Sequence, residues 1–401
     1  MQFNVEPGKL TIGGGRTSGI YMKFLHTSDW HLGRQFHNVS LLEDQRHVLN
    51  EIYDIITREN IDVVLIAGDI YDRSVPPADA VDLLDDAIYH INHILKKPLI
   101  IISGNHDSGR RLGFGSRQMT RSGVHIMGQL SQDIAPVILN DKHGEIAFYG
   151  IPYADPASVR DVFQIDIHSH EDAMRVLTSQ IKSHNTVNRR TVVLGHCFID
   201  GGTESDSERP LSVGGADKVP YDLFSDFSYT ALGHLHGPQF KGLESIRYSG
   251  SILKYSFSEV TQRKSVTIVN MGATGECSIE KIPLKPLRNM RVVEGCLEEI
   301  LAAAKDDLDA NDYLLVRLLD THALYEPLKK LREVYPNILQ LEKPNLNQGG
   351  ERQKLKRENL KKGELPMFLD FYQQMTASEL GDTAIDLVSA ALDDIHKGEE
   401  K

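Results

Sequence analysis

Five short apolar stretches of this sequence each run directly into a cluster of polar residues that contains Asp, Asn or His. They read LHTSDWHLG, LIAGDIYDR, IISGNHD, VLGHCF and ALGHLHG, and they begin at residues 25, 65, 101, 193 and 231. Continuous apolar runs, in place of alternating apolar and polar residues, are typical of strands that are covered on both faces. The chain is therefore predicted to fold around buried β-structure that carries polar side chains at its strand ends.

The polar clusters are expected to meet in space. The carboxyl ends of parallel strands lie along one edge of a sheet, so residues far apart in the sequence can converge there. In an extended chain, residues i and i+2 project to the same face. Asp29 with His31, and His234 with His236, would therefore each present both side chains together.

The residue types at these strand ends predict a metal site. A lone histidine is more often a satisfied core residue, but four histidines, two aspartates and an asparagine at strand ends favour metal binding. This mixture suits manganese, iron or zinc better than magnesium alone. Seven ligands exceed the needs of one ion, so we expect two ions that share a carboxylate, an arrangement that hydrolyses phosphate esters. The candidate ligands are Asp29, His31, Asp69, Asn105, His196, His234 and His236.

The alternation of elements predicts the fold class. Val48, Ile52, Ile55 and Ile56 have the spacing of one amphipathic helix, and similar helical segments alternate with the apolar strands over residues 22–285. This order predicts a layered α/β domain. Residues 1–21 are glycine-rich and lack a sustained period, and we expect them to lie outside the fold.

The rest of the chain is expected to form two further parts. A proline-broken stretch, residues 281–295, reads as a link, and residues 286–348 read as a small α/β domain. Residues 349–401 begin with a basic segment and continue into two amphipathic helices. The second of these helices is predicted to start with a capping box from Thr376 to Glu379. These helices either pack against their own domain or bind a partner protein.

Composition limits the remaining possibilities. No run approaches the ~18 apolar residues of a membrane span, and the three cysteines of this 401-residue chain are too scattered for a disulfide framework, which makes a reducing cytoplasm the expected location. The net charge of −12 argues weakly against extensive nucleic-acid binding. However, residues 109–121 and 349–363 are locally basic and are candidates for phosphate contacts.

The five motifs, in this order, resemble the signature of the calcineurin-like metallophosphoesterases. Two further stretches, ESDSERPLSVGGAD (204–217) and RYSGSILKYSFSE (247–259), resemble the bacterial SbcD nuclease subunits, the partners of the SbcC ATPases. The likeness covers about residues 22–345 well and the remaining residues more loosely. It implies a layered metallophosphoesterase sandwich with a small α/β capping domain and C-terminal helices.

The resemblance implies roles for individual residues. The first metal would be held by Asp29, His31 and His236, the bridge would be Asp69, and the second site would be completed by Asn105, His196 and His234.

The resemblance also implies that His106 acts as general acid or stabilises the transition state. Archaeal and eukaryotic relatives have a histidine where Asp72 stands, whereas the broader phosphatase family has an aspartate that orients the catalytic histidine, and we expect that role for Asp72. Arg73, Arg110, Arg111 and Arg117 are candidate DNA contacts.

The implied function is a manganese-supported nuclease that degrades double-stranded DNA ends and cuts single strands or hairpins in DNA repair and recombination. The chain has no G-x-x-x-x-G-K-[ST] loop, which is consistent with ATP use by an SbcC-type partner. The C-terminal helices would bind that partner in a heterotetramer with a nuclease dimer. Two alternatives stay open: a small-molecule or protein phosphatase with the same metal core, and a scaffold of this fold without catalysis.

Overall fold

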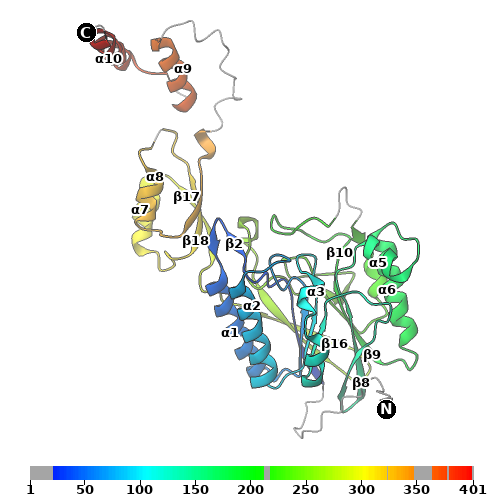
Figure 1. Cartoon of the computed structure of the whole chain (residues 1–401). Coiled ribbons are helices and arrows are strands. Elements are labelled where there is room, and N and C mark those ends of the chain that lie inside the picture. Colours follow the sequence, from blue (N-terminus) through cyan, green and yellow to red (C-terminus); the bar gives the residue numbers. More distant parts are fainter. Residues whose placement is uncertain (1–20, 212–216, 323, 347–363, 377–378, 400–401) are drawn as a thin grey trace. The chain divides into compact units, whose positions relative to one another are not determined.

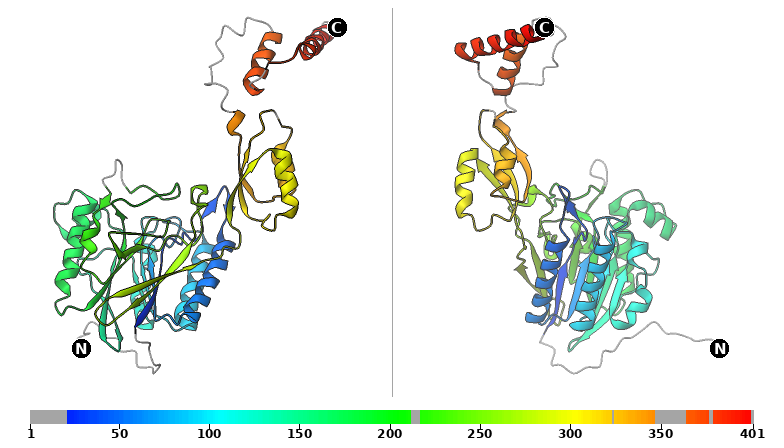
Figure 2. Two further views of the ribbon diagram at one scale, coloured as in Figure 1. Left: turned by 180° about the vertical axis from the view of Figure 1, so that it is seen from behind. Right: turned by 60° about the vertical axis from the view of Figure 1, so that its left-hand side comes forward.

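The predicted apolar stretches form strands in two six-stranded sheets that face each other (Figures 1 and 2). The structure is a computed structural model, and it describes residues 21–211, 217–322, 324–346, 364–376 and 379–399. Residues 1–20 and the basic segment 349–363 therefore lie outside the described residues. The chain divides into two units between Leu287 and Arg288.

The first sheet contains three of the five motif strands. Its β1, β4, β5 and β6 run parallel, β15 pairs antiparallel with β1, and β16 pairs antiparallel with β15. In order across the sheet, the strands are β16 (Cys277–Pro283), β15 (Ser265–Met271), β1 (Met22–Thr27), β4 (Val63–Ala67), β5 (Leu99–Ile102) and β6 (Val124–Met127).

The second sheet contains the other two motif strands, β9 and β12, which pair in parallel. The outermost strands, β7 and β13, are antiparallel to their neighbours. In order across the sheet, the strands are β13 (Gln239–Lys241), β14 (Leu243–Tyr248), β12 (Tyr229–Gly233), β9 (Arg190–His196), β8 (Gly144–Ile151) and β7 (Val137–Asp141).

A buried apolar layer joins the two sheets. Phe24 and Leu65 of the first sheet pack in one cluster with Phe148, Val192 and Tyr229 of the second. Because successive strand residues point to opposite faces, the intervening residues are covered by helices on the outer faces. This explains why the motif strands are apolar throughout and confirms the predicted layered α/β sandwich.

Helices cover the outside of this sandwich (Figure 1). The predicted helix around Val48 is α1 (Leu42–Arg58), which buries Val48, Ile52, Ile55 and Ile56. Further helices are α2 (Ala78–Ile88), continued by a π-helical turn (Tyr89–Ile94), α3 (Gly109–Leu112), α4 (Ser116–Met119), α5 (Pro156–Phe163) and α6 (His170–His184). Short strand pairs are β2 (Gln35–Phe36) with β3 (Val39–Ser40), and β10 (Phe198–Ile199) with β11 (Lys218–Val219).

The second unit contains a three-stranded parallel sheet with its own apolar core. Its elements are β17 (Met290–Gly295), α7 (Leu297–Ala303), β18 (Tyr313–Leu318), α8 (Pro327–Arg332) and β19 (Ile338–Glu342). The stretch predicted as a link is therefore only partly a link, because its last six residues form β17. These six residues pair in parallel with β18, and the local sequence does not reveal this partner strand.

The C-terminal part contains α9 (Glu364–Thr376) and α10 (Asp382–Glu399). The predicted capping box is wrong, because Thr376 is the last residue of α9 and the next helix begins at Asp382. The two helices are nevertheless in the predicted order, and both carry exposed apolar residues. Phe371 of α9 is 60% exposed and Leu387 of α10 is 69% exposed.

Candidate metal centre

The seven candidate ligands come from the carboxyl ends of five strands, three in the first sheet and two in the second. Asp29 and His31 follow β1, Asp69 follows β4, and Asn105 follows β5. His196 ends β9, and His234 and His236 follow β12. All of them except Asn105, which is half-buried, are buried. The sequence analysis treated these ends as one sheet edge, and the structure forms that edge from two sheets.

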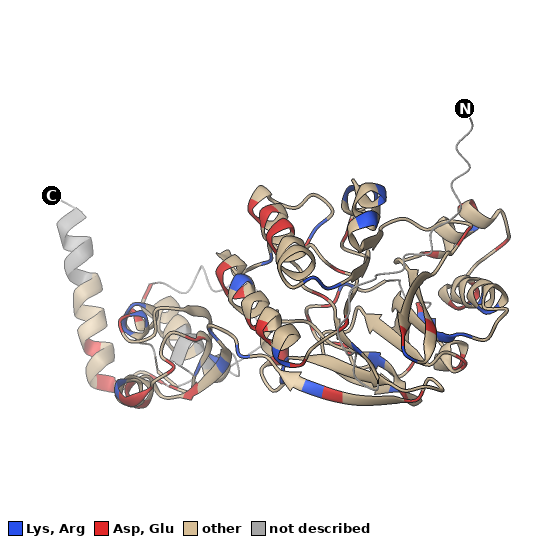
Figure 3. Cartoon of the chain, turned by 90° about the horizontal axis from the view of Figure 1, so that it is seen from below, with Lys and Arg blue, Asp and Glu red and all other residues tan. Residues whose placement is uncertain are grey.

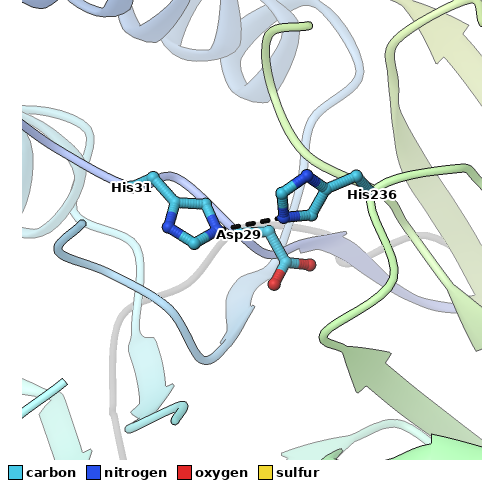
Figure 4. Close-up of side chains that lie close together, drawn as sticks. All are labelled: Asp29, His31 and His236. Carbon is cyan, nitrogen blue, oxygen red and sulfur yellow. Dashed lines mark hydrogen bonds between the residues drawn. The ribbon is translucent and has the colours of Figure 1, made fainter. Parts of the chain in front are cut away.

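One set of ligands comprises Asp29, His31 and His236 (Figure 4), and each residue offers an atom within 4.8 Å of the others. The Nε2 atoms of His31 and His236 lie 3.1 Å apart. This set combines the i and i+2 residues that follow β1 with one histidine from the second sheet. The sequence placed Asp29 and His31 together, but only the facing of the two sheets brings His236 to them.

Asp69 lies between this set and the histidine of β9. Its Oδ2 atom is 3.6 Å from His31 Nε2 and 3.5 Å from His196 Nε2. Its Oδ1 atom accepts a hydrogen bond from the backbone N–H of His106 at 2.9 Å. A carboxylate in this position can serve two ions at once.

The other side of Asp69 carries Asn105, His196 and His234. His196 Nε2 is 2.9 Å from Asn105 Oδ1, and the rings of His196 and His234 are 5.5 Å apart. His234 Nε2 is buried and has no hydrogen-bond partner among the described residues. An unpaired buried nitrogen is costly, which is the condition expected of a metal ligand.

The imidazole orientations also fit divalent metal ions. His196 Nδ1–H donates to the carbonyl oxygen of Ala67 at 2.9 Å, and His236 Nδ1–H donates to Ser207 Oγ at 2.5 Å. A neutral imidazole that donates through one nitrogen presents a lone pair at the other. Both Nε2 atoms face the centre as potential ligands, as metal-binding histidines generally do. Burial opposes protonation of His196, but Asp69 raises its pKa to about 9, so a metal ion would displace a proton from its Nε2. The centre suits divalent metals.

The charges of the centre depend strongly on one another. Burial favours the neutral form of Asp69, but the adjacent imidazoles of His196 and His31 hold its pKa well below the usual range. Burial lowers the pKa of His234 to about 3, so this imidazole is neutral at pH 7. Burial raises the pKa of Asp29 to about 6, although His196 and His236 oppose the shift. Cations in the centre would offset the cost of the buried carboxylates.

The backbone at this centre adopts unusual conformations. Asp29, His31, Asp69 and His234 all have positive φ angles, between 45° and 105°, and such residues cluster at functional sites. Glycine is required beside them, because a Cβ atom on Gly68 would lie 2.3 Å from His196 Nδ1. The glycines that precede several of the ligands therefore permit the two sheets to approach closely.

His106 is half-buried at the margin of the centre, and its Nε2 lies 4.0 Å from Asp69 Oδ2. Its Nδ1–H donates to the main-chain carbonyl of Asp72 at 2.8 Å. The Asp72 carboxylate instead accepts from Arg34 Nη1 at 2.9 Å. The contact between Asp72 and His106 is therefore made by the main chain of Asp72 and not by the side chain whose type prompted the prediction.

The sequence analysis missed a group of buried residues behind His236. Ser207 accepts from His236 Nδ1 and donates to the Glu259 carboxylate. Glu259 in turn accepts from Lys264 Nζ at 2.5 Å, and Glu208 accepts from the backbone N–H of His236 at 2.8 Å. Ser207, Glu208 and Glu259 lie in the two stretches that were noticed only for their family likeness. The local sequence does not distinguish these buried acids from the other acids of the serine-rich stretches.

Asp107 was also left without a role in the sequence analysis. Its carboxylate accepts hydrogen bonds from the backbone N–H groups of Ile70, Tyr71 and Gly104 at 2.9–3.0 Å. Burial and the nearby Asp69 raise its pKa to about 7. Asp107 thereby connects the loop after β4, which carries Asp69, to the loop after β5, which carries Asn105.

The four candidate DNA-contacting arginines are all exposed. Arg110 and Arg111 lie on α3 and Arg117 on α4. Arg111 donates to the carbonyl oxygen of Ser74 at 2.8 Å, which brings it to the same surface loop as Arg73. Arg73 lies 3.8 Å from the Asp72 carboxylate.

Comparison with known proteins agrees with this geometry. The sequence pattern of the calcineurin-like phosphoesterases matches residues 22–238, and that of the "type 5 capsule protein repressor C-terminal domain" matches residues 286–376. The SbcD subunit of the nuclease SbcCD from Staphylococcus epidermidis is 35% identical over 372 residues, which are 92% of this chain and 98% of that protein. The corresponding protein of Staphylococcus saprophyticus is 37% identical over 80% of this chain and 84% of that protein.

A solved structure of a dimetal phosphatase from Danio rerio covers 66% of this chain and 99% of its own, at 11% identity and a TM-score of 0.38. Within the part of the chain that the structure describes, no helix is both long and apolar enough to cross a membrane. The match over more than half of the chain and the near full-length relatives establish its kinship. The chain belongs to the calcineurin-like phosphoesterases and, within them, to the family of the SbcD subunits of SbcCD nucleases.

Proposed function

We propose that this protein is a metal-dependent DNA phosphodiesterase that acts as an exonuclease on double-stranded ends and as an endonuclease on single strands and hairpins. The position of Asp69 is the observation that carries the proposal, because its carboxylate lies between imidazoles from both sheets. Residues 22–285 form the nuclease domain in this proposal.

The proposed ligand sets are Asp29, His31 and His236 on one side and Asn105, His196 and His234 on the other, with Asp69 shared. Two divalent cations, when bound, would activate water and neutralise charge on the phosphoryl oxygens. We propose manganese, because the donors are carboxylate, imidazole and amide with no thiolate.

His106 is proposed as the general acid, or as a donor to the transition state. Its Nδ1–H is engaged by the Asp72 carbonyl, so its Nε2 is available to exchange a proton with the leaving oxygen. The half-buried position of the ring at the margin of the centre supports access to substrate. General acid catalysis of this kind contributes about 10²–10⁴-fold.

DNA contacts are proposed for the exposed arginines Arg73, Arg110, Arg111 and Arg117, and residues 286–348 are proposed as the capping domain. Each phosphate contact contributes to the salt dependence of binding. Replacing Arg110, Arg111 and Arg117 with alanine should weaken DNA binding and flatten the plot of log affinity against log salt concentration. An unchanged slope would remove this segment from the footprint.

Residues 349–401 are proposed to comprise a basic linker and the helices that bind an SbcC-type ATPase in the cytoplasm, within a heterotetramer built on a nuclease dimer. Met367, Phe368 and Phe371 are exposed and lie within about one turn of α9, which supports a partner-binding role, since clustered exposed apolar residues mark interaction sites. Deleting residues 366–401 should abolish association with the ATPase and spare metal-dependent cleavage of a small phosphodiester. Retained association would contradict this assignment.

The nuclease activity is tested with a hairpin DNA and a phosphomonoester, each supplied with manganese, using the wild type and His106→Gln. The nuclease should cleave the hairpin, and His106→Gln should lose most of that activity. Hydrolysis of the monoester alone would favour a phosphatase, and the absence of any hydrolysis would favour a scaffold without catalysis.

A further inference from the structure

The segment that follows His106 combines positive charge with an exposed aromatic ring. Residues 109–121 contain four arginines and no acid, so this segment contributes blue and no red to Figure 3. Phe114, between α3 and α4, is 86% exposed. Arg110, Arg117 and Arg121 form no ion pair with any residue that the structure describes. Such combinations of cations and an aromatic face are typical of single-stranded nucleic-acid binding.

A cavity of about 590 Å³ adjoins this segment. Its lining includes Arg110 and Arg117 together with the apolar residues Met127, Leu130 and Ile134. The lining also contains Gly113 and Ser116, the residues flanking the Phe114–Gly115 turn. The cavity therefore combines two guanidinium groups, which can contact an anion, with apolar side chains beside the Phe114–Gly115 turn.

The framework of the cavity holds a defined shape. Gly109 and Gly128 approach so closely that a Cβ atom on Gly109 would lie 1.8 Å from the carbonyl oxygen of Gly128. Ser103 Oγ donates to that same carbonyl oxygen at 2.8 Å. The lining also contains one acid, Asp133, whose carboxylate lies 3.6 Å from His184 Nε2.

The cavity also neighbours the metal centre. Its lining residue Pro152 precedes Tyr153, whose ring lies 6.5 Å from the ring of His196. The backbone N–H of Tyr153 donates to the carbonyl oxygen of Ser103 at 2.8 Å, which connects the end of β8 with the strand that leads to Asn105. A DNA strand with a phosphate in the metal centre would have adjacent nucleotides within reach of this surface.

We propose that Phe114, Arg110, Arg117 and the cavity beside them bind an unpaired nucleotide of the DNA substrate. The base stacks on Phe114, and the arginines contact its phosphate. This inference rests on the proposed nuclease function and specifies the state of the DNA, because a base within a duplex has no free face to stack on a side chain. An unpaired nucleotide is present in single strands, in hairpin loops and at frayed ends.

The test is DNA binding by the full-length protein in EDTA, measured by fluorescence anisotropy with a single-stranded oligonucleotide and with a duplex closed at both ends. Stacking contributes about 1–3 kcal/mol per base, or roughly 5–150-fold in affinity. Phe114→Ala should therefore weaken single-strand binding about tenfold and leave duplex binding within about twofold. Phe114→Tyr should retain binding, and Tyr89→Ala, which removes a ring that is 55% exposed elsewhere, should have no effect.

The inference would be overturned if Phe114→Ala left the affinity for the single strand unchanged, or weakened binding of the single strand and the duplex equally. Unchanged DNA affinity together with weaker association with the ATPase would assign Phe114 to a protein interface. Hydrolysis of bis(p-nitrophenyl) phosphate with manganese by the wild-type protein tests the nuclease separately from DNA binding. A wild-type protein that binds single strands through Phe114 but hydrolyses no phosphodiester would refute the nuclease and leave this binding site standing.

Discussion

The two sides of the metal centre differ in how they are enclosed. The side with Asp29, His31 and His236 is fully buried, and further buried polar residues lie behind it. On the other side His196 and His234 are also buried, but Asn105 and His106 are half-buried and lie on a loop that leads into exposed arginines. The closed side is organised to hold its ligands in one geometry, whereas the open side is where a phosphodiester can enter.

The closed side is held by a continuous chain of hydrogen bonds. His236 donates to Ser207, Ser207 donates to Glu259, and Lys264 neutralises Glu259. Burial opposes ionisation of Glu259, but His236 and Lys264 hold its pKa well below the usual range. On the open side, Asp107 connects the loops that carry Asp69 and Asn105 by accepting hydrogen bonds from backbone N–H groups. The difference indicates that the closed side holds its metal ligands in a fixed geometry, whereas the open side leaves the proposed general acid, His106, accessible to the substrate.

The largest effect is expected from Asp69→Asn, since this carboxylate serves both sides. The amide cannot provide two anionic oxygens, so both ions should bind more weakly. Loss of about 4 kcal/mol of charge stabilisation corresponds to roughly a 10³-fold lower kcat. Manganese content and kcat on a phosphodiester measure the outcome, and an Asp69→Asn protein with normal metal content would contradict the shared position.

A smaller effect is expected from Ser207→Ala, which sharpens the comparison at the closed side. The variant removes the hydroxyl between His236 and Glu259 but leaves the Glu259–Lys264 ion pair intact. Outer-sphere substitutions of this kind weaken metal affinity by about 10–100-fold. Calorimetric titration with manganese measures the affinity.

Ser225→Ala serves as the matched control, because Ser225 is exposed and its hydroxyl donates to the carbonyl of Asp222. Unchanged manganese affinity in Ser207→Ala would show that Ser207 does not position His236.

Glu259→Gln should additionally reduce the free energy of unfolding by about 3–5 kcal/mol, because it leaves Lys264 buried and unpaired.

The smallest effect is expected from Asp72→Asn on the open side. His106 is bonded to the main-chain carbonyl of Asp72, which this substitution retains. The variant loses the charge opposite Arg34, and kcat should fall less than about tenfold, in contrast to His106→Gln with its expected loss of about 10²–10⁴-fold. Equal losses of kcat in Asp72→Asn and His106→Gln would show that the Asp72 side chain orients His106.

Much of this centre could be predicted because its chemistry resides in residue types. Asp, Asn and His after continuous apolar strands are unusual enough to identify candidate ligands, and glycine beside them indicates close backbone approach. The amphipathic spacing of α1 was equally visible. The start of α10 could not be predicted in the same way, because a Ser or Thr followed three residues later by Glu often occurs by chance. An N-cap contributes only about 1 kcal/mol to helix stability, which other interactions easily outweigh.

The sequence by itself determined which side chains could bind metal, because donor type is a property of each residue and the strand pattern brings each donor to a strand end. Only the tertiary structure decided that β1, β4 and β5 belong to one sheet and β9 and β12 to the other. It also decided that Ser207 and Glu259 lie behind His236 and that Asp72 reaches His106 through its carbonyl oxygen. Every residue has a carbonyl group, so the sequence does not indicate which carbonyl contacts His106. Contacts between distant segments depend on how the layers pack, so the local sequence pattern does not predict the residues behind His236 either.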